Sequence, residues 1–301
     1  MPSWILKAAL QKTLDLLPGG PALYRWGLAR FSHRITSHFL ADRLAHVERH
    51  LAAWQDAHPG QLPGRVLELG TGWCPVVPLG LWLCGVDQVD TYDIRLLVKT
   101  STLEKLKAAI LERAQEGQLK IHLPKLQSAR LDQLLALSSG EQLSPQAWLA
   151  RLGIRTFALP LSTRADLVIS NNTFEHIPTR ALRKLLPHLW AATRPGGVMS
   201  HYVDLVDHYS YFDARLSPFH FLRFSPSQWA CIENRFQSQN RLRWPQYQVL
   251  FHEAGIPIDR EECESEPAAA LNALPLHEEF LTLPEPELLV SYVHIISQRP
   301  I

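Results

Sequence analysis

Two glycines separated by one residue follow an apolar run whose last residue but one is an acid, giving E-L-G-T-G over residues 68–72. Glycine has no side chain, so a ligand can approach the backbone there, and the N–H groups of a following helix attract polar groups. A dinucleotide pyrophosphate would need a third glycine where this chain has Pro75, and Glu68 would repel it. Glu68 could instead receive a cationic or hydroxyl-bearing ligand. The segment predicts a small-ligand site, with a ligand-free strand-to-helix turn as the alternative.

A second acid, Asp93, ends the next expected strand about twenty residues further on. The two oxygens of a carboxylate at this point can accept hydrogen bonds from both hydroxyls of a ribose. An isolated aspartate after a strand is more often a turn residue or a helix cap. Its register with the glycine turn favours the ribose, so the two strand ends are expected to form one nucleoside pocket.

Two asparagines, Asn171 and Asn172, follow the apolar run 165–170. Open α/β sheets bind ligands at the carboxyl ends of their strands, and amide side chains offer hydrogen bonds of both polarities. Either asparagine could instead start a turn. We expect at least one of them to touch the ligand.

The pair Glu175-His176 comes next and allows two kinds of chemistry. His176 could act as a general base and Glu175 could bind a cation, because imidazole titrates near neutrality and carboxylates bind hard cations. A packed, hydrogen-bonding histidine before Pro178 is the commoner arrangement. His176 therefore stays a catalytic candidate with that alternative.

His208 is the preferred general base, because it follows the apolar run 198–203 and Asp204 or Asp207 could orient it. His201 lies inside the same run and is expected to be buried. A metal site made of His201, His208 and an aspartate has no standard ligand spacing, so we predict no metal.

The stretch from 204 to 248 is rich in aromatic and basic residues and has no simple strand period. Aromatic rings and arginines can bind a sugar, an aromatic compound or an acidic group, although a lid needs the same residues for packing. The expected acceptor-binding residues are Tyr202, Tyr209, Arg241 and Arg243.

The elements that must position these residues alternate between strands and helices, which predicts a doubly wound, mainly parallel sheet. Pro-Gly pairs at 59–60 and 63–64 and an R-P-G-G segment at 194–197 separate them. Strands are expected over 65–69, 88–93, 156–159, 165–170, 198–203 and 288–296. Helices are expected over 4–17, 22–58, 75–84, 96–115, 128–152 and 179–193.

These elements predict an N-terminal helical cap over residues 1–60 and a core over 61–301, with a lid inserted at 206–250. The acidic run 261–266 is expected to lie in solvent.

Composition limits the class of ligand. The 301 residues carry 30 Lys and Arg against 29 Asp and Glu, so no strong field favours nucleic acid. Four scattered cysteines predict no zinc finger and a reduced, cytoplasmic protein. Charges interrupt the apolar N-terminus, so we expect no stable membrane insertion, with a surface-lying amphipathic helix as the alternative.

The ordered set of E-L-G-T-G, Asp93, the segment A-D-L-V-I-S-N-N-T-F-E-H-I at 165–177 and R-P-G-G resembles class I S-adenosylmethionine-dependent methyltransferases. The resemblance covers roughly residues 60–205 and the last strand. It implies a Rossmann-like seven-stranded sheet whose antiparallel last strand lies between strands five and six. Cys74 and Pro75 depart from the family, which commonly has a third glycine there. The donor contacts that the resemblance and the turn imply are Glu68, Gly70, Thr71, Gly72, Trp73, Asp93, Ile94, Asn171 and Asn172.

The implied activity is methyl transfer from S-adenosylmethionine to a small molecule or sugar, at oxygen before nitrogen or sulfur. Residues 222–225 and 240–244 are similar to bacterial methyltransferases of polysaccharide or secondary metabolism. Direct displacement needs mainly alignment, and a base only for a weakly acidic acceptor. An NAD-type oxidoreductase and a noncatalytic nucleoside-binding or partner-binding module are the alternatives. The acceptor, a role for a divalent metal and the oligomeric state stay open.

Overall fold

The computed structural model describes residues 3–20, 22–24, 27, 34–137 and 143–301. Parts of the helices predicted over 22–58 and 128–152 lie outside the described residues. The chain forms two compact units. Unit 1 comprises Met1–Arg34, Asn172–Leu186 and Tyr202–Ile295. Unit 2 comprises Ile35–Asn171, Pro187–His201 and Ile296–Ile301.

A seven-stranded sheet has the order β3-β2-β1-β4-β5-β7-β6. Strand β1 is parallel to both β2 and β4, and β2 is parallel to β3. The strands are β1 (Arg65–Leu69), β2 (Gln88–Asp93), β3 (Ile154–Ala158), β4 (Ala165–Asn171), β5 (Thr193–Asp204), β6 (Arg260–Ser265) and β7 (Val290–Gln298). The predicted alternation of strands and helices is therefore confirmed as a Rossmann-like sheet.

Strand β7 runs antiparallel to β5. In unit 2 the Gly196 N–H donates to the Arg299 carbonyl at 2.9 Å, and in unit 1 the Leu205 N–H donates to the Ser291 carbonyl at 2.8 Å. Residue numbers thus fall along β7 as they rise along β5. The expected antiparallel last strand between the fifth and sixth strands is confirmed.

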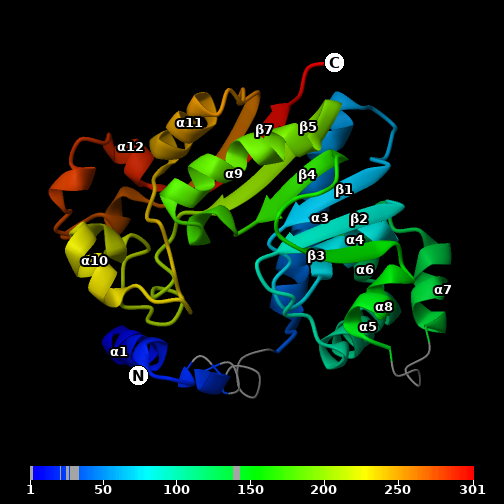
Figure 1. The fold of residues 1–301 in the computed structure, drawn as a ribbon, viewed down its shortest axis with the longest axis horizontal. Helices are drawn as coiled ribbons and strands as arrows, with labels where there is room; N and C mark the ends of the chain where they lie inside the picture. The colour runs from blue at the N-terminus through cyan, green and yellow to red at the C-terminus, as the bar shows by residue number, and fades with distance from the viewer. Residues whose placement is uncertain (1–2, 21, 25–26, 28–33, 138–142) are drawn as a thin grey trace. The chain divides into compact units, whose positions relative to one another are not determined.

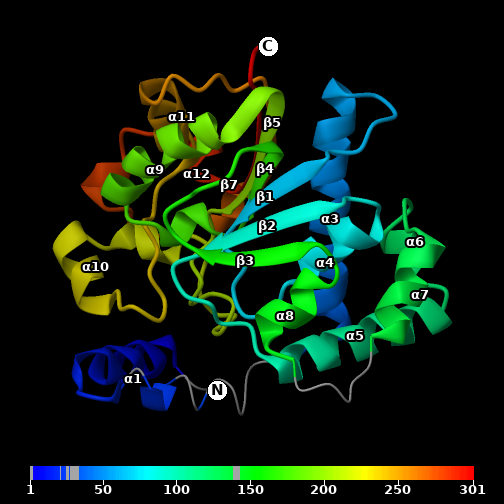
Figure 2. The same ribbon diagram turned by 45° about the vertical axis from the view of Figure 1, so that its right-hand side comes forward.

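The helices of unit 2 pack beside the parallel strands, with α3 and α4 behind β1 to β3 in Figure 2. They are α3 (Ser37–Ala57), α4 (Val76–Leu83), α5 (Thr100–Gln115), α6 (Leu119–His122), α7 (Ser128–Ala136) and α8 (Pro145–Ala150). Helix α9 (Thr179–Ala192) has residues in both units. Leu44, Val47 and Leu51 of α3 are fully buried in the apolar core that also contains α4. Their spacing of three and four residues places them on one helix face.

The helices of unit 1 include α1, which packs against α10 (Figure 1). Lys12 of α1 donates to the carbonyls of Ala230 and Glu233 at 2.9 and 2.7 Å. The elements of unit 1 outside the sheet and α9 are α1 (Trp4–Leu16), η1 (Phe174–His176), η2 (His220–Arg223), α10 (Pro226–Ile232), α11 (Trp244–Glu253), η3 (Ala268–Ala270), η4 (Glu278–Phe280) and α12 (Glu285–Leu288).

Several element boundaries differ from the predictions, and three of the differences have a clear physical reason. The described part of the 22–58 helix is broken because Thr36 is extended and caps α3, its Oγ1 accepting from Phe39 N–H at 3.1 Å. Helix α5 starts at Thr100 rather than residue 96, and Leu96 and Leu97 are exposed. The R-P-G-G segment already belongs to β5, because Gly196 pairs with the last strand.

Strand β6 was not predicted as a strand. All six of its residues are exposed, as expected for the acidic run, but their backbone lies at the edge of the sheet beside β7. Charged side chains on an edge strand discourage pairing with other chains.

Candidate functional site

The glycine turn follows β1 directly. Gly70 and Gly72 have φ angles of 85° and 66°, which glycine adopts without steric cost. The Gly70 N–H donates to the Tyr92 carbonyl at 2.7 Å, which fixes the turn against β2. A Cβ built on Gly72 would meet no heavy atom of the described chain within 4 Å. The turn therefore presents open backbone at this glycine.

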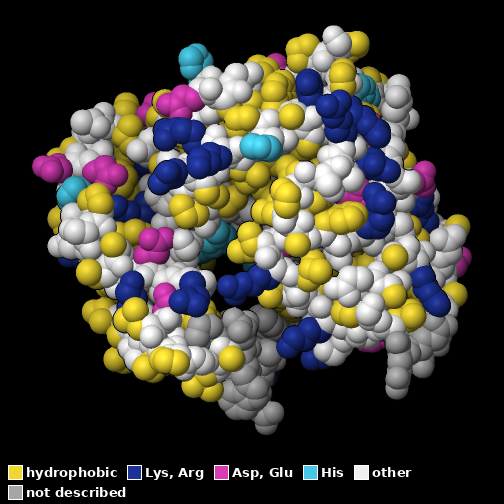
Figure 3. Space-filling view, viewed as in Figure 1, with side chains coloured by type: hydrophobic (Ala, Val, Ile, Leu, Met, Phe, Trp, Pro, Cys, Tyr) yellow, Lys and Arg dark blue, Asp and Glu magenta, His cyan; other side chains and the backbone are white. Residues whose placement is uncertain are grey.

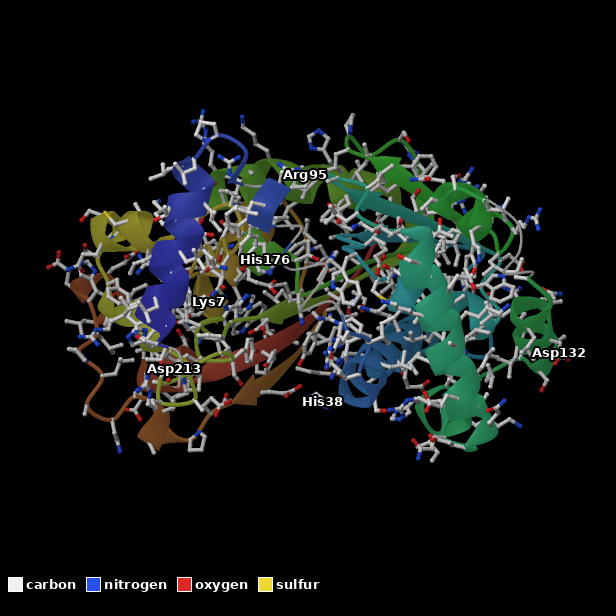
Figure 4. The ribbon with its side chains drawn as sticks, turned by 90° about the horizontal axis from the view of Figure 1, so that it is seen from below. Lys7, His38, Arg95, Asp132, His176 and Asp213 are labelled. Atoms are coloured by element: carbon white, nitrogen blue, oxygen red, sulfur yellow. The ribbon has the colours of Figure 1, made fainter. Side chains whose placement is uncertain are left out.

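Asp93, the last residue of β2, forms a hydrogen bond to this turn. Its Oδ2 accepts the Gly72 N–H at 2.9 Å, and its Oδ1 accepts the N–H of Arg95, which Figure 4 labels, at 3.1 Å. Each carboxylate oxygen has a second lone pair, so Asp93 retains acceptor capacity for a hydroxyl. The structure thus brings Asp93 and the turn together, as their positions at neighbouring strand ends predicted.

Glu68 is the charged side chain beside the turn, and its side chain is buried. Burial raises the pKa of this carboxyl to about 8, and Asp93 adds to the rise, while Thr71 and Arg43 partly offset it. Its Oε2 has no hydrogen-bond partner among the described residues. A cationic or hydrogen-bonding ligand would stabilise a buried carboxyl of this kind.

The remaining residues of the turn have different surroundings. Trp73 is half-buried and stacks on Phe39 of α3, with ring centroids 5.4 Å apart. Ile94 is exposed. Cys74, which stands where the family commonly has glycine, is buried in the core of unit 2, and burial raises the pKa of its thiol to about 12. Cys74 therefore packs as an apolar residue.

Asn171 at the end of β4 is held by a buried histidine that sequence reasoning missed. His50 Nε2 lies 2.8 Å from Asn171 Oδ1, and His50 Nδ1 lies 2.7 Å from Ser200 Oγ. An amide oxygen only accepts, so Nε2 carries the proton and Nδ1 accepts from the serine hydroxyl. His50 lies on the apolar stripe of α3, and that position was the available signal.

Asn172 belongs to unit 1 and has a φ of 46°, a conformation in which asparagine is enriched among non-glycine residues. Its N–H donates to the Tyr202 carbonyl at 2.9 Å. Its side-chain Oδ1 is buried and has no hydrogen-bond partner in the described part of the chain. This oxygen is available to a ligand donor.

The two catalytic candidates lie together in unit 1. The rings of His176 and His208 meet edge to face with centroids 4.9 Å apart. His208 Nε2 lies 3.2 Å from Asp204 Oδ2, which also accepts from the Tyr211 hydroxyl at 2.8 Å. Asp204, rather than Asp207, is thus the carboxylate that orients His208.

His201 is fully buried in β5, and its Nδ1 lies 2.8 Å from Ser170 Oγ. This agrees with the expected burial of a histidine inside a strand.

The two tyrosines expected to bind an acceptor are both buried. The Tyr202 hydroxyl donates to Glu264 at 3.0 Å, and its ring stacks on Tyr292 with centroids 5.6 Å apart. The Tyr209 hydroxyl donates to Gln11 at 3.2 Å. An acceptor-binding role for either tyrosine stays a prediction.

The two arginines expected to bind an acceptor donate to backbone carbonyls of unit 1, and an acceptor-binding role for either stays a prediction. Arg241 donates to the carbonyls of Phe221 and Phe224 at 3.0 and 2.6 Å. Arg243 is fully buried, and its guanidinium donates to the carbonyls of Leu205, Leu288 and Val290. Burial lowers the pKa of Arg243 to about 9. The sequence could not show this, because the carbonyls come from distant segments.

The surface and helices bear on the expected partners. Lys and Arg side chains form several groups on the face drawn in Figure 3, with Asp and Glu side chains among them. Within the described residues, no helix combines the length and the apolar character that a membrane span requires.

Comparison with known proteins gives matches among solved structures only, since no family model and no curated protein matches the chain. Magnesium protoporphyrin IX methyltransferase from Synechocystis PCC 6803, with bound SAH, is 14% identical with a TM-score of 0.45, over 97% of this chain and 99% of that one. A methyltransferase from Methanosarcina mazei is 15% identical with a TM-score of 0.42, over 80% and 94% of the two chains.

An O-methyltransferase family protein from Burkholderia thailandensis is 12% identical with a TM-score of 0.40, over 87% of this chain. This chain spans only 57% of that protein's length. At such identities and TM-scores, the function must be inferred from the residues of the site itself.

Proposed function

We propose that this chain is an S-adenosylmethionine-dependent methyltransferase that methylates an oxygen atom of a small molecule or sugar. The observation that carries the proposal is the contact between Asp93 and the Gly72 N–H, at 2.9 Å, beside the buried Glu68. One turn thus offers a ribose acceptor, open backbone and a carboxyl.

The donor's chemical groups match this turn. S-adenosylmethionine carries an ammonium, a ribose and no phosphate, and when bound it supplies a methyl group on a positively charged sulfur. Asp93 would accept from the ribose hydroxyls, while Glu68 and the backbone at Gly70 and Gly72 would bind the amino-acid portion. The buried, unpartnered Glu68 Oε2 and the open space at Gly72 support this fit. Thr71, Trp73, Ile94, Asn171 and Asn172 complete the proposed donor contacts.

An NAD-type oxidoreductase fits the same turn less well. The pyrophosphate seat of a dinucleotide usually has a third glycine, and this chain has Pro75 at that position. Asp93 would suit the ribose of either ligand, so Pro75 is the residue that disfavours a dinucleotide.

The proton of a hydroxyl acceptor is assigned to the histidine pair of unit 1. His208, oriented by Asp204, and the neighbouring His176 could remove it as general bases, or could bind a cation that makes the hydroxyl more acidic. Both uses leave His208 and His176 as the catalytic candidates.

Calorimetry with S-adenosylmethionine, S-adenosylhomocysteine and NAD tests the proposal. We expect the two methionine-derived ligands to bind and NAD not to bind. Asp93→Ala should weaken donor binding by roughly 10- to 100-fold, because each lost hydrogen bond to a charged group is worth about 1.5–3 kcal/mol. Asp132→Ala is the matched control, since Asp132 is exposed on α7 (Figure 4).

Failure of both methionine-derived ligands to bind would reject the proposal. Binding without S-adenosylhomocysteine release in a broad screen of hydroxylated metabolites and sugars would instead favour the noncatalytic module.

A further inference from the structure

A group of three potential metal ligands lies in unit 1. Glu175 and His176 belong to η1, and His208 follows β5. One ligand atom from each residue lies within 4.8 Å of the other two. Glu175 is buried, whereas His176 is exposed. We propose that these three side chains bind a divalent transition-metal ion.

The first argument is the tautomer of His176. Its Nδ1 lies 2.7 Å from the backbone carbonyl of Ser238. A carbonyl oxygen only accepts hydrogen bonds, so Nδ1 must carry the proton. In the neutral ring, Nε2 then keeps its lone pair, which is the form that a metal requires.

His208 is prepared in the corresponding way. Its Nε2 lies 3.2 Å from the Asp204 carboxylate, which also only accepts when ionised, so Nε2 carries the proton and Nδ1 keeps its lone pair. A carboxylate that accepts the second N–H of a histidine is the usual support of a metal-binding imidazole. Both rings therefore have one nitrogen fixed by an acceptor and the other available.

Residues 238–240 form hydrogen bonds that position all three proposed metal ligands. Besides the Ser238 carbonyl, the Gln239 side-chain oxygen accepts the His208 backbone N–H at 2.9 Å. The Asn240 backbone N–H donates to the Glu175 carbonyl at 2.8 Å. The Asn240 side-chain amide also donates to the carbonyls of Phe174 and Ile177, which flank the ligand pair, at 2.8 and 2.9 Å. One segment thus fixes the backbone of η1, the ring of its histidine and the start of the segment at His208.

The donor set indicates the class of metal. Two neutral imidazoles and one carboxylate suit zinc, iron, cobalt or nickel, whereas calcium and magnesium prefer oxygen ligands alone. Ligand atoms about 2.1 Å from one ion are at most roughly 4.2 Å apart, so any pair near the 4.8 Å limit must move closer. Small adjustments of the three side chains can supply this change. One carboxylate leaves a divalent ion with a net positive charge, ready for an oxygen ligand.

Metal binding can be tested without reference to methyl transfer. The tag-free protein is stripped with dipicolinic acid, dialysed, and titrated with Zn²⁺ by calorimetry and with Co²⁺ by its visible absorption. We expect one ion per chain and cobalt bands that report nitrogen ligands. Glu175→Gln, His176→Ala and His208→Ala should each weaken binding at least tenfold, and Asp204→Asn should weaken it about 10- to 100-fold as a positioning residue.

His252→Ala is the matched control, because His252 is exposed on α11 of the same unit and should leave the affinity unchanged. Circular dichroism and thermal unfolding of each metal-free variant check that it is folded. The proposal is overturned if the wild type binds no stoichiometric ion, or if folded ligand variants bind as tightly as the wild type. Calorimetry with S-adenosylmethionine on metal-free protein separately tests the donor site.

Discussion

Replacing Glu68 with glutamine should remove a pH dependence of the free energy of unfolding that the buried Glu68 carboxyl causes. The ordinary pKa of 4.5 rises to about 8 in the folded chain, mainly through burial. At about 1.4 kcal/mol per pKa unit, this difference corresponds to roughly 5 kcal/mol between the protonated and ionised forms. Glutamine has nearly the same shape and does not titrate.

The sign follows from which state holds the proton more tightly. The folded chain binds the Glu68 proton better than the unfolded chain, so this stabilisation is complete below pH 4.5 and is lost as the pH rises through about 8. Between pH 5 and pH 8 the free energy of unfolding of the wild type should fall by roughly 3–4 kcal/mol relative to Glu68→Gln. Urea unfolding at several pH values measures the difference.

Binding of S-adenosylmethionine should lower the raised pKa of Glu68. If Glu68 binds an ammonium group, it must be ionised in the complex, although at pH 7 a carboxyl with this pKa is about nine-tenths protonated. The wild type should therefore release about 0.9 proton on binding S-adenosylmethionine, and Glu68→Gln close to none. Calorimetry in phosphate and Tris, whose ionisation enthalpies differ, counts the protons. Equal proton release by both proteins would refute this role of Glu68.

Three further substitutions test the assignments of single residues. Gly72→Ala should lower the free energy of unfolding by about 1 kcal/mol in thermal denaturation, because alanine is disfavoured at a φ of 66°. The added Cβ meets open space, so a loss above about 3 kcal/mol would contradict that openness. Arg243→Leu should destabilise the chain by about 3–5 kcal/mol in urea unfolding, since buried carbonyls lose their donor. Unchanged stability with a raised KM for the acceptor would contradict this structural role and support acceptor binding by Arg243. His50→Leu should cost about 2–4 kcal/mol and weaken donor binding by misplacing Asn171, and unaltered donor affinity in calorimetry would separate His50 from the donor site.

The part of the fold around the glycine turn was predictable because its signals are local. Strands β1 and β2 have the predicted bounds, since apolar runs bounded by breakers define buried parallel strands. Parallel pairing places Leu69 beside Tyr92, so the residues that follow each strand must be neighbours. Strand order and one sequence position thus sufficed to bring Asp93 to the glycine turn. Strand β6 escaped prediction because its side chains bury nothing, and only backbone pairing at the sheet edge defines it.

Unit 1 was harder to predict because its key contacts join distant segments. Arginine is a residue type that often binds ligands, yet the burial of Arg243 depends on carbonyls at residues 205, 288 and 290. The same limit applies to the histidine pair. His176 and His208 could be singled out by type, but their usable nitrogens are decided by Ser238 and Asp204, and no periodicity in the sequence connects the segment 238–240 with either ring. A residue's type therefore predicted the chemistry available to it, while the partner on its second polar atom decided which part of that chemistry remained free for a ligand.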